Sequence, residues 1–243
     1  MLHEYTLFNN SLGEIPMTKT LISTLNAHSF NIVRKDPHFR AALNGSNVLL
    51  PDGVSVVWAV KLLTGQRIKK IAGDDLFHYQ MKRLNDSGGK CFFLGSSNET
   101  LQRISERAII DYPNVQVSHY SPPFKAEFSE DDSYAMVEHV NDENPDVLFI
   151  GMTAPKQEKW AFQNFDKLNV CHICCIGAVF DFYAGTSKRA PKWVIKIGLE
   201  WLYRLMKNPK RMWRRYLIGN TKFIITIIKE KFLISTGLIK VQN

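Results

Sequence analysis

The feature that most constrains the fold is a regular alternation of short β-rich runs and longer helical stretches over about the first 187 residues. Such alternation is typical of βαβ units, which form a parallel sheet with helices on both faces. The sequence therefore predicts an α/β, Rossmann-like fold with a mostly parallel sheet. We expect strands at 21–24, 48–50, 90–95, 115–118, 146–151 and 172–176, and helices at 54–63, 74–84 with Asp74 as its cap, 99–111, 130–141 and 156–165.

Composition supports one sizeable domain with an appendage. The chain has 243 residues, of which 45% are hydrophobic, and no repeat period recurs, so disordered, coiled-coil and repeat classes are excluded. Three of the four cysteines crowd into an apolar run at 171–175, as buried thiols of a reducing compartment do. The first residues lack a basic start and an apolar stretch, so we expect a cytoplasmic protein.

Charge divides the chain near residue 188. Residues 188–243 carry a net charge of +12, whereas residues 1–187 carry −4. The sequence therefore predicts a catalytic α/β domain over 1–187 and a basic helical appendage over 188–243. A partner that meets the appendage alone would be anionic, either a lipid surface or a nucleic acid.

Apolar residues in the appendage favour a membrane surface. Trp193, Ile197, Trp201 and Leu205 recur at a four-residue spacing, and further aromatic residues alternate with lysine and arginine, namely Trp213, Tyr216, Phe223 and Phe232. This pattern predicts peripheral binding to the inner face of the cell membrane, where basic residues contact anionic lipid. The most apolar run of the C-terminal part, 223–228, is too short to cross a bilayer. In the alternative, the apolar face packs on the body.

A nucleic-acid partner is not expected, because no helix-turn-helix, zinc-finger or RNA-binding signature accompanies the basic run. The sequence leaves open whether the chain forms a homo-oligomer.

Ligands of parallel α/β sheets bind beyond the carboxyl ends of the strands. Two glycine-containing loops at such ends, 95–98 and 151–157, lead into helices, where backbone N–H groups would suit a diphosphate. Ordinary turn chemistry explains the glycines equally well. Neither loop is G-x-G-x-x-G or a Walker loop, so the sequence does not indicate a dinucleotide or ATP.

Two acidic residues, Asp52 and Asp181, also follow strand ends. Either could serve as a general base. An acid between Pro51 and Gly53 is otherwise typical of a helix cap. Periodicity does not decide which of the two acts. No D-x-D pair or His/Cys cluster suggests a metal site.

Several strings together resemble the WecG/TagA/CpsF glycosyltransferase family over about residues 15–220. They are Ser23-Thr-Leu-Asn26, Leu50-Pro-Asp-Gly-Val54, Ile71-Ala-Gly-Asp-Asp-Leu76, Phe93-Leu-Gly95, Pro145-Asp-Val-Leu-Phe-Ile-Gly-Met152, Pro155-Lys-Gln-Glu158, Gly177-Ala-Val-Phe-Asp181, Arg189-Ala-Pro-Lys-Trp193 and Gly198-Leu-Glu-Trp-Leu-Tyr-Arg-Leu205. Their order and spacing together are specific, although each string alone is common.

The resemblance implies an inverting enzyme of bacterial surface polysaccharide or teichoic acid synthesis. It would move an N-acetylmannosamine-type sugar or a related hexose from a UDP-sugar to an acceptor sugar linked to undecaprenyl diphosphate, without a metal or another cofactor. Alternatives from other classes are a noncatalytic nucleotide-sugar or lipid-binding module and a nucleic-acid-binding protein.

By similarity Asp52 would be the catalytic base, with Thr24 and Asn26 beside it. Lys70 stands where the family commonly has arginine, which keeps the charge but not the bidentate geometry. The arginines of the appendage would bind diphosphates or lipid headgroups. The full set expected to bind substrate is Thr24, Asn26, Gly53, Lys70, Gly95, Gly151, Gln157, Asp181, Arg211, Arg214 and Arg215.

Overall fold

The computed structural model describes residues 2–238, apart from the side chain of Lys192. Its centre is a six-stranded sheet in the order β2-β1-β6-β5-β3-β4, in which every neighbouring pair is parallel. The α/β, Rossmann-like prediction is therefore confirmed. The strands are β1 (Thr20–Leu25), β2 (Val48–Pro51), β3 (Lys90–Gly95), β4 (Gln116–Tyr120), β5 (Val147–Gly151) and β6 (His172–Cys175).

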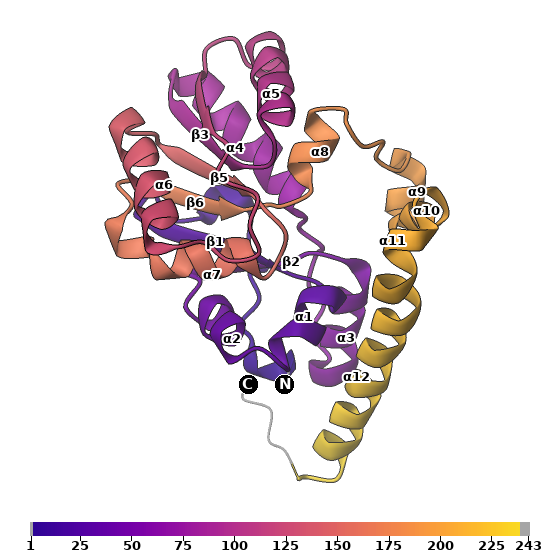
Figure 1. Ribbon diagram of the computed structural model, residues 1–243. Coiled ribbons are helices and arrows are strands. Elements are labelled where there is room, and N and C mark those ends of the chain that lie inside the picture. The colour runs from indigo at the N-terminus through magenta and orange to yellow at the C-terminus, as the bar shows by residue number, and fades with distance from the viewer. Residues whose placement is uncertain (1, 239–243) are drawn as a thin grey trace.

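Helices cover both faces of this sheet (Figure 1). The α-helices of the described chain are α1 (Ala27–Val33), α2 (Pro37–Asn44), α3 (Val54–Thr64), α4 (Gly73–Ser87), α5 (Asn98–Asp111), α6 (Glu130–Glu143), α7 (Lys156–Gln163), α8 (Val179–Tyr183), α9 (Lys192–Lys196), α10 (Glu200–Lys207), α11 (Pro209–Trp213) and α12 (Gly219–Ser235), of which α9 to α12 lie to the side of the sheet (Figure 1). Short 3₁₀ turns occupy η1 (Leu2–Glu4), η2 (Leu12–Glu14) and η3 (Phe165–Lys167), and a π turn, η4 (Arg214–Ile218), joins α11 to α12.

Alternate residues of the strands point to opposite faces and build two cores. In β5, Phe149 packs with Phe77 of α4 and Phe180 of α8, whereas the neighbouring Leu148 packs on the other face with α6 and α7. Because both faces of the sheet are buried, the strand sequences are continuous apolar runs and do not alternate between apolar and polar residues. Because all six strands run parallel, their carboxyl ends lie at one edge of the sheet.

The start of α4 differs from the prediction. The helix begins at Gly73, and the Asp75 carboxylate accepts the N–H of Ala72 at 2.7 Å. The prediction that Asp74 caps this helix is therefore wrong. Asp74 is instead one residue into the first turn, where its carboxylate is free to pair with other side chains.

A third core joins the C-terminal helix to the body. Phe223 and Ile227 of α12 are fully buried against α1 and α3, and the rings of Phe223 and Phe30 meet edge to face with centroids 5.4 Å apart. Tyr216 is also buried. The expectation that Phe223 and Tyr216 face a membrane is therefore wrong, because the body covers Phe223 and Tyr216 is buried with Trp201 and Arg204 of the tail beside it.

The expected four-residue apolar face of the appendage is interrupted. Gly198, with a φ of +78°, separates α9 from α10, so Trp193 and Ile197 do not continue into Trp201 and Leu205 on one helix. A left-handed backbone is favourable for glycine and ends a helix. Trp193 is 67% exposed, whereas Trp201 and Leu205 are half-buried.

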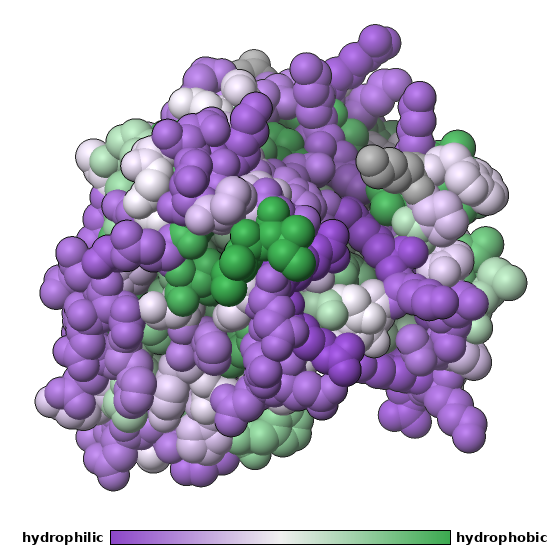
Figure 2. Space-filling view, turned by 90° about the horizontal axis from the view of Figure 1, so that it is seen from above, coloured by the Kyte–Doolittle hydropathy of each residue, from purple (hydrophilic) through white to green (hydrophobic). Residues whose placement is uncertain are grey.

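The outer side of α12 remains apolar. Ile224, Ile225, Ile228 and Phe232 are exposed there, although Phe223 and Ile227 of the same helix are buried. Viewed from above, after a 90° turn from Figure 1, the surface of the molecule is by contrast mostly hydrophilic. Its most strongly hydrophobic area is a compact patch near the middle of this view (Figure 2). Among the described residues, none of the helices has the length and hydropathy needed to span a bilayer.

Candidate active site

The ends of β1 and β2 lie side by side and bring Asn26 and Asp52 together. Leu25 is in register with Pro51, and the N–H of Asp52 donates to the carbonyl of Leu25 at 2.9 Å. Parallel strands end at the same edge of a sheet, which is where open α/β sheets bind ligands. Thr24, next to this pair, is largely buried.

Asp52 does not cap the helix that follows it. Helix α3 begins at Val54 and its cap residue is Gly53, which has a φ of +129° and offers no side-chain bond to the helix. The helix-cap alternative is therefore wrong. The carboxylate of Asp52 is half-buried at the sheet edge and available for another role.

The surroundings of Asp52 act on its pKa in both directions. Burial raises the pKa of Asp52, and the charge of Glu200 raises it further. The charges of Lys70 and Arg204 and a hydrogen bond from Asn26 lower it. The Asn26 carbonyl oxygen already accepts the N–H groups of His28 and Ser29, so its amide group is the donor left for Asp52. A carboxylate placed in this way can accept a proton from a neutral donor.

Charged residues of the C-terminal appendage lie close enough to Asp52 to act on its pKa. Glu200 and Arg204 come from α10, and Arg215, which also acts on Asp52, comes from the π turn η4. Arg215 is half-buried, and its Nε is buried without a hydrogen-bond partner. Burial and the charge of Arg215 lower the pKa of the neighbouring His28 to about 4. The site therefore combines arginine side chains with carboxylates, and the buried Nε of Arg215 has no hydrogen-bond partner.

Asp181 belongs to the same cluster. It lies on α8, where burial raises its pKa and the charges of Arg211 and Arg204 lower it. Arg204 acts on both carboxylates, so the structure brings Asp52 and Asp181 within the electrostatic reach of one guanidinium. The two acids still have similar surroundings, so the geometry alone does not separate their roles.

Sequence reasoning missed Arg204 and Glu200. Both lie in the string 198–205 that carries the family resemblance, and they are charged residues four apart on the helix α10. Residues at this spacing share one helix face. That spacing was the signal that could have identified them.

The glycines of two expected diphosphate loops are explained by packing. Gly95 has a φ of +111°, and a Cβ there would lie 2.9 Å from the carbonyl oxygen of Gly151. A Cβ on Gly151 would lie 2.2 Å from the ring of Phe180. Both positions therefore require glycine for the close approach of β3, β5 and α8. A binding role for these glycines stays a prediction.

Gln157 is buried rather than open to a cleft. Its Oε1 accepts the N–H of Met152 at 3.2 Å, and its Nε2 donates to Glu158 at 2.8 Å. The second oxygen of Glu158 is buried without a partner, and burial raises the pKa of Glu158 to about 7. In this structure Gln157 holds the loop between β5 and α7, and contact with substrate would require the loop to shift.

Two of the basic residues expected to bind substrate, Lys70 and Arg211, line separate surface hollows, each of about 330 Å³. One contains Lys70 with Asn9, Asn10 and Asp75, and the other contains Arg211 with Lys207 and Lys210. Arg214 is exposed, and its guanidinium lies 5.3 Å from the ring centre of Trp213. In the part of the chain described, no three His, Cys, Asp or Glu side chains are grouped so that they could hold a metal ion.

Comparison with known proteins identifies the family. The model of the glycosyl transferase WecG/TagA/CpsF family matches residues 8–236. Relatives named N-acetylglucosaminyldiphosphoundecaprenol N-acetyl-beta-D-mannosaminyltransferase include one from Bacillus subtilis (strain 168), which is 31% identical over 87% of this chain and 80% of its own. Another, from Staphylococcus aureus (strain MW2), is 27% identical over 86% of this chain and 81% of its own. Because the family model covers nearly the whole chain, this protein belongs to the WecG/TagA/CpsF family and is a glycosyltransferase.

Proposed function

We propose that the chain transfers an N-acetylmannosamine-type hexose from a UDP-sugar to an acceptor sugar carried on undecaprenyl diphosphate, with inversion at the anomeric carbon. The named activity of the relatives supports this choice of donor sugar and acceptor. The assignment of the catalytic base rests on the carboxylate of Asp52, which is half-buried, does not cap a helix and is under the influence of the charges of Arg204 and Arg215.

In this mechanism Asp52 takes the proton of the acceptor hydroxyl as its oxygen attacks the anomeric carbon. The bond from that carbon to the β-phosphate oxygen of UDP breaks, and UDP leaves with the electron pair. General-base catalysis of this kind contributes about 100- to 10,000-fold. Arg204, Arg211 and Arg215 stabilise the negative charge that grows on UDP, a contribution that is often the largest single one.

We also propose that residues 188–243 act as an appendage that docks on the anionic inner face of the membrane. The exposed apolar residues of α12 and the exposed Arg214 support this role. An acceptor with a polyprenyl tail stays in the bilayer, so the enzyme must bind at its surface. Docking there places the basic cluster next to the lipid diphosphate.

The test is UDP release from a panel of UDP-sugars in the presence of a lipid-diphosphate-linked N-acetylglucosamine acceptor. Asp52→Asn should stay folded and still bind UDP but turn over at least about 100-fold more slowly, because only the base is lost. The matched control is Asp86→Asn, which alters an exposed carboxylate on α4 and should match the wild type. Near-normal turnover of Asp52→Asn would transfer the role of base to Asp181.

Metal dependence is tested in the same assay. Activity should persist in excess EDTA, because the cationic side chains are proposed to stabilise the leaving UDP. Loss of activity in EDTA that magnesium or manganese restores would contradict that assignment.

A further inference from the structure

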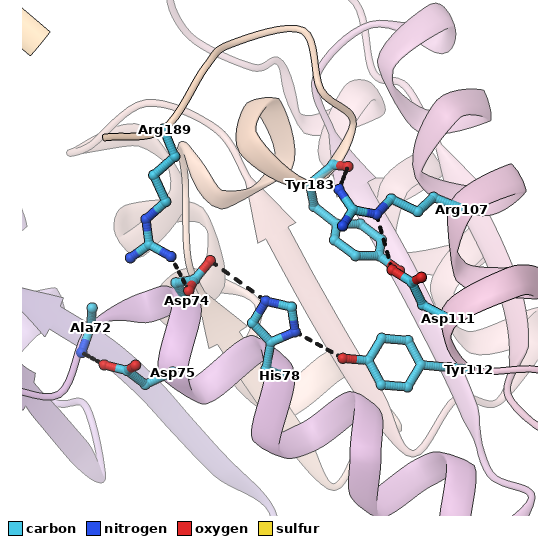
Figure 3. A network of polar contacts seen from close by, with 9 residues as sticks. All are labelled: Ala72, Asp74, Asp75, His78, Arg107, Asp111, Tyr112, Tyr183 and Arg189. Atoms are coloured by element: carbon cyan, nitrogen blue, oxygen red, sulfur yellow. Dashed lines mark hydrogen bonds and ion pairs between the residues drawn. The ribbon is translucent and has the colours of Figure 1, made fainter. Parts of the chain in front are cut away.

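The linker between α8 and α9, residues 184–191, is tied to the body by one arginine. The guanidinium of Arg189 donates from Nη1 to Oδ2 of Asp74 in the first turn of α4 (Figure 3). The two side chains are only 27% and 17% exposed, and Nε2 of His78 lies 3.8 Å from the other oxygen of Asp74. A partly shielded, charge-assisted pair of this kind fixes geometry better than an exposed one.

Arg189 also shares an aromatic ring with the active site. Its guanidinium carbon lies 5.9 Å from the ring centre of Phe182, and the guanidinium carbon of Arg204 lies 4.8 Å from the same ring. Both distances are within the range of cation–π contacts. Phe182 thus connects the linker with α10, and it directly follows Asp181.

Arg204 links the Phe182 ring to the carboxylates, because its charge acts on both Asp52 and Asp181. The charged groups that act on Asp52 are Lys70, Glu200, Arg204 and Arg215, and those that act on Asp181 are Arg204 and Arg211. Arg189 is not among these groups, and its connection to the carboxylates runs through the shared Phe182 ring to Arg204. An arginine side chain has many rotamers, so the placement of Arg204 depends on the groups that it contacts.

We infer that Arg189 is a positioning residue: paired with Asp74 and in cation–π contact with Phe182, it holds the linker and the Phe182 ring so that Arg204 stays near both Asp52 and Asp181. The inference rests on the proposed function for the chemistry of these carboxylates. A misplacement of about 1 Å far from the reacting atoms can cost about 100-fold in rate. The ion pair at the base of the linker is thus part of the catalytic arrangement although it does not touch substrate.

The first test is a double-mutant cycle on turnover. Arg189→Gln should lower kcat/KM by about 10- to 100-fold, mostly through kcat, and should add little in the Arg204→Gln background. Arg189→Lys keeps the charge of the pair and should recover much of the loss. The control is Arg103→Gln, which breaks the exposed pair with Glu99 on α5 and should stay within about two-fold of the wild type.

A second test needs no substrate. The pKa values of Asp52 and Asp181, followed by NMR of their carboxyl carbons, should rise in Arg189→Gln as they do in Arg204→Gln, because a stabilising cation has moved away in both. They should not change in Arg103→Gln. If Arg189→Gln does not fold, Phe182→Leu removes the shared ring and should raise both pKa values in the same direction.

The outcomes separate this inference from the proposed function. A wild-type protein that transfers no sugar would contradict the proposed function and leave the titration as the deciding test. Unchanged carboxyl pKa values in Arg189→Gln, or an equal loss of turnover in the wild-type and Arg204→Gln backgrounds, would overturn the positioning role.

Discussion

Helices α10 and α12 belong to the same basic tail but are held by different forces. Helix α12 inserts Phe223 and Ile227 into a core shared with α1 and α3. Helix α10 buries none of its residues completely, and Arg204 attaches it through the ring of Phe182 and the hydroxyl of Tyr216. In the tail, α12 is thus firmly packed, whereas the preceding segment with α10 is held by polar and ring contacts. That preceding segment carries charges that act on the proposed catalytic carboxylates. By net charge the tail is a single basic segment. By packing, α12 belongs to a buried core, whereas α10 does not.

The packing of α12 predicts the largest change. Phe223→Ala should lower the free energy of unfolding by about 3–5 kcal/mol, because it empties a fully buried site. Urea unfolding followed by circular dichroism measures this difference. Phe232→Ala is the matched control on the same helix, where the side chain is 65% exposed, and should cost less than about 0.5 kcal/mol.

A similar loss from both variants would show that α12 does not pack as described. If the packing is correct, a chain that ends before residue 192 should aggregate, because the third core would be exposed.

A buried carboxylate on α12 tests the same anchoring at its other end. Glu230 is 1% exposed and accepts the backbone N–H groups of Leu2 and His3, each at 3.1 Å. Glu230→Ala should cost about 2–3 kcal/mol in unfolding free energy, because buried donors lose a charged acceptor. The same denaturation assay applies, with Glu106→Ala on the surface of α5 as the control. Equal stability of the two variants would mean that α12 does not secure the N-terminal turn.

Membrane binding should depend on the exposed side of the tail. Arg214→Glu should weaken binding to vesicles of anionic lipid by about 2 kcal/mol, about 30-fold, because two units of charge change at about 1 kcal/mol each. Vesicle sedimentation measures it, and higher salt should mimic the variant. Arg103→Glu on α5 changes the charge equally and should bind as the wild type does. A wild-type protein that ignores anionic vesicles at physiological salt would contradict membrane docking.

The smallest expected effect is a shift of the pH profile. The proposed base must be ionised, and burial raises the pKa of Asp52, so kcat/KM should fall with decreasing pH at a higher pH than for an ordinary aspartate. Arg204→Gln removes a charge that lowers this pKa, so its acidic limb should lie at still higher pH. Lys82→Gln on the exposed side of α4 should keep the wild-type limb. An unchanged limb in Arg204→Gln would place Arg204 away from the base.

The strands could be predicted because their signal is local. β3 and β5 are apolar runs bounded by turn residues, and the predicted and observed ranges differ by no more than one residue at either end. The start of α4 shows the limit of such reasoning. Asp74 and Asp75 are adjacent acids at a helix N-terminus, and only the backbone path decides which one reaches the N–H of Ala72.

The site was predicted in part. Asp52 and Asn26 could be placed together, because both follow strands of a parallel sheet. Gln157 was expected at the substrate, yet it is buried in contact with Glu158, since the outcome depends on how α7 packs. Arg204 was missed because its partners, Asp52 and Asp181, are distant in the sequence and only tertiary packing brings α10 to them.

The sequence by itself determined the parallel α/β body, the edge of the sheet where ligands would bind, and the excess of positive charge in the tail. These properties follow from hydrophobic periodicity and composition, which each segment carries on its own. Only the tertiary structure decided that Phe223 enters the core while Phe232 stays exposed, and that Arg189, Phe182 and Arg204 form one connection to the carboxylates. An aromatic or cationic side chain has similar local preferences in a core, on a membrane or over an active site. The partner that packs against it makes the difference, and that partner lies elsewhere in the chain.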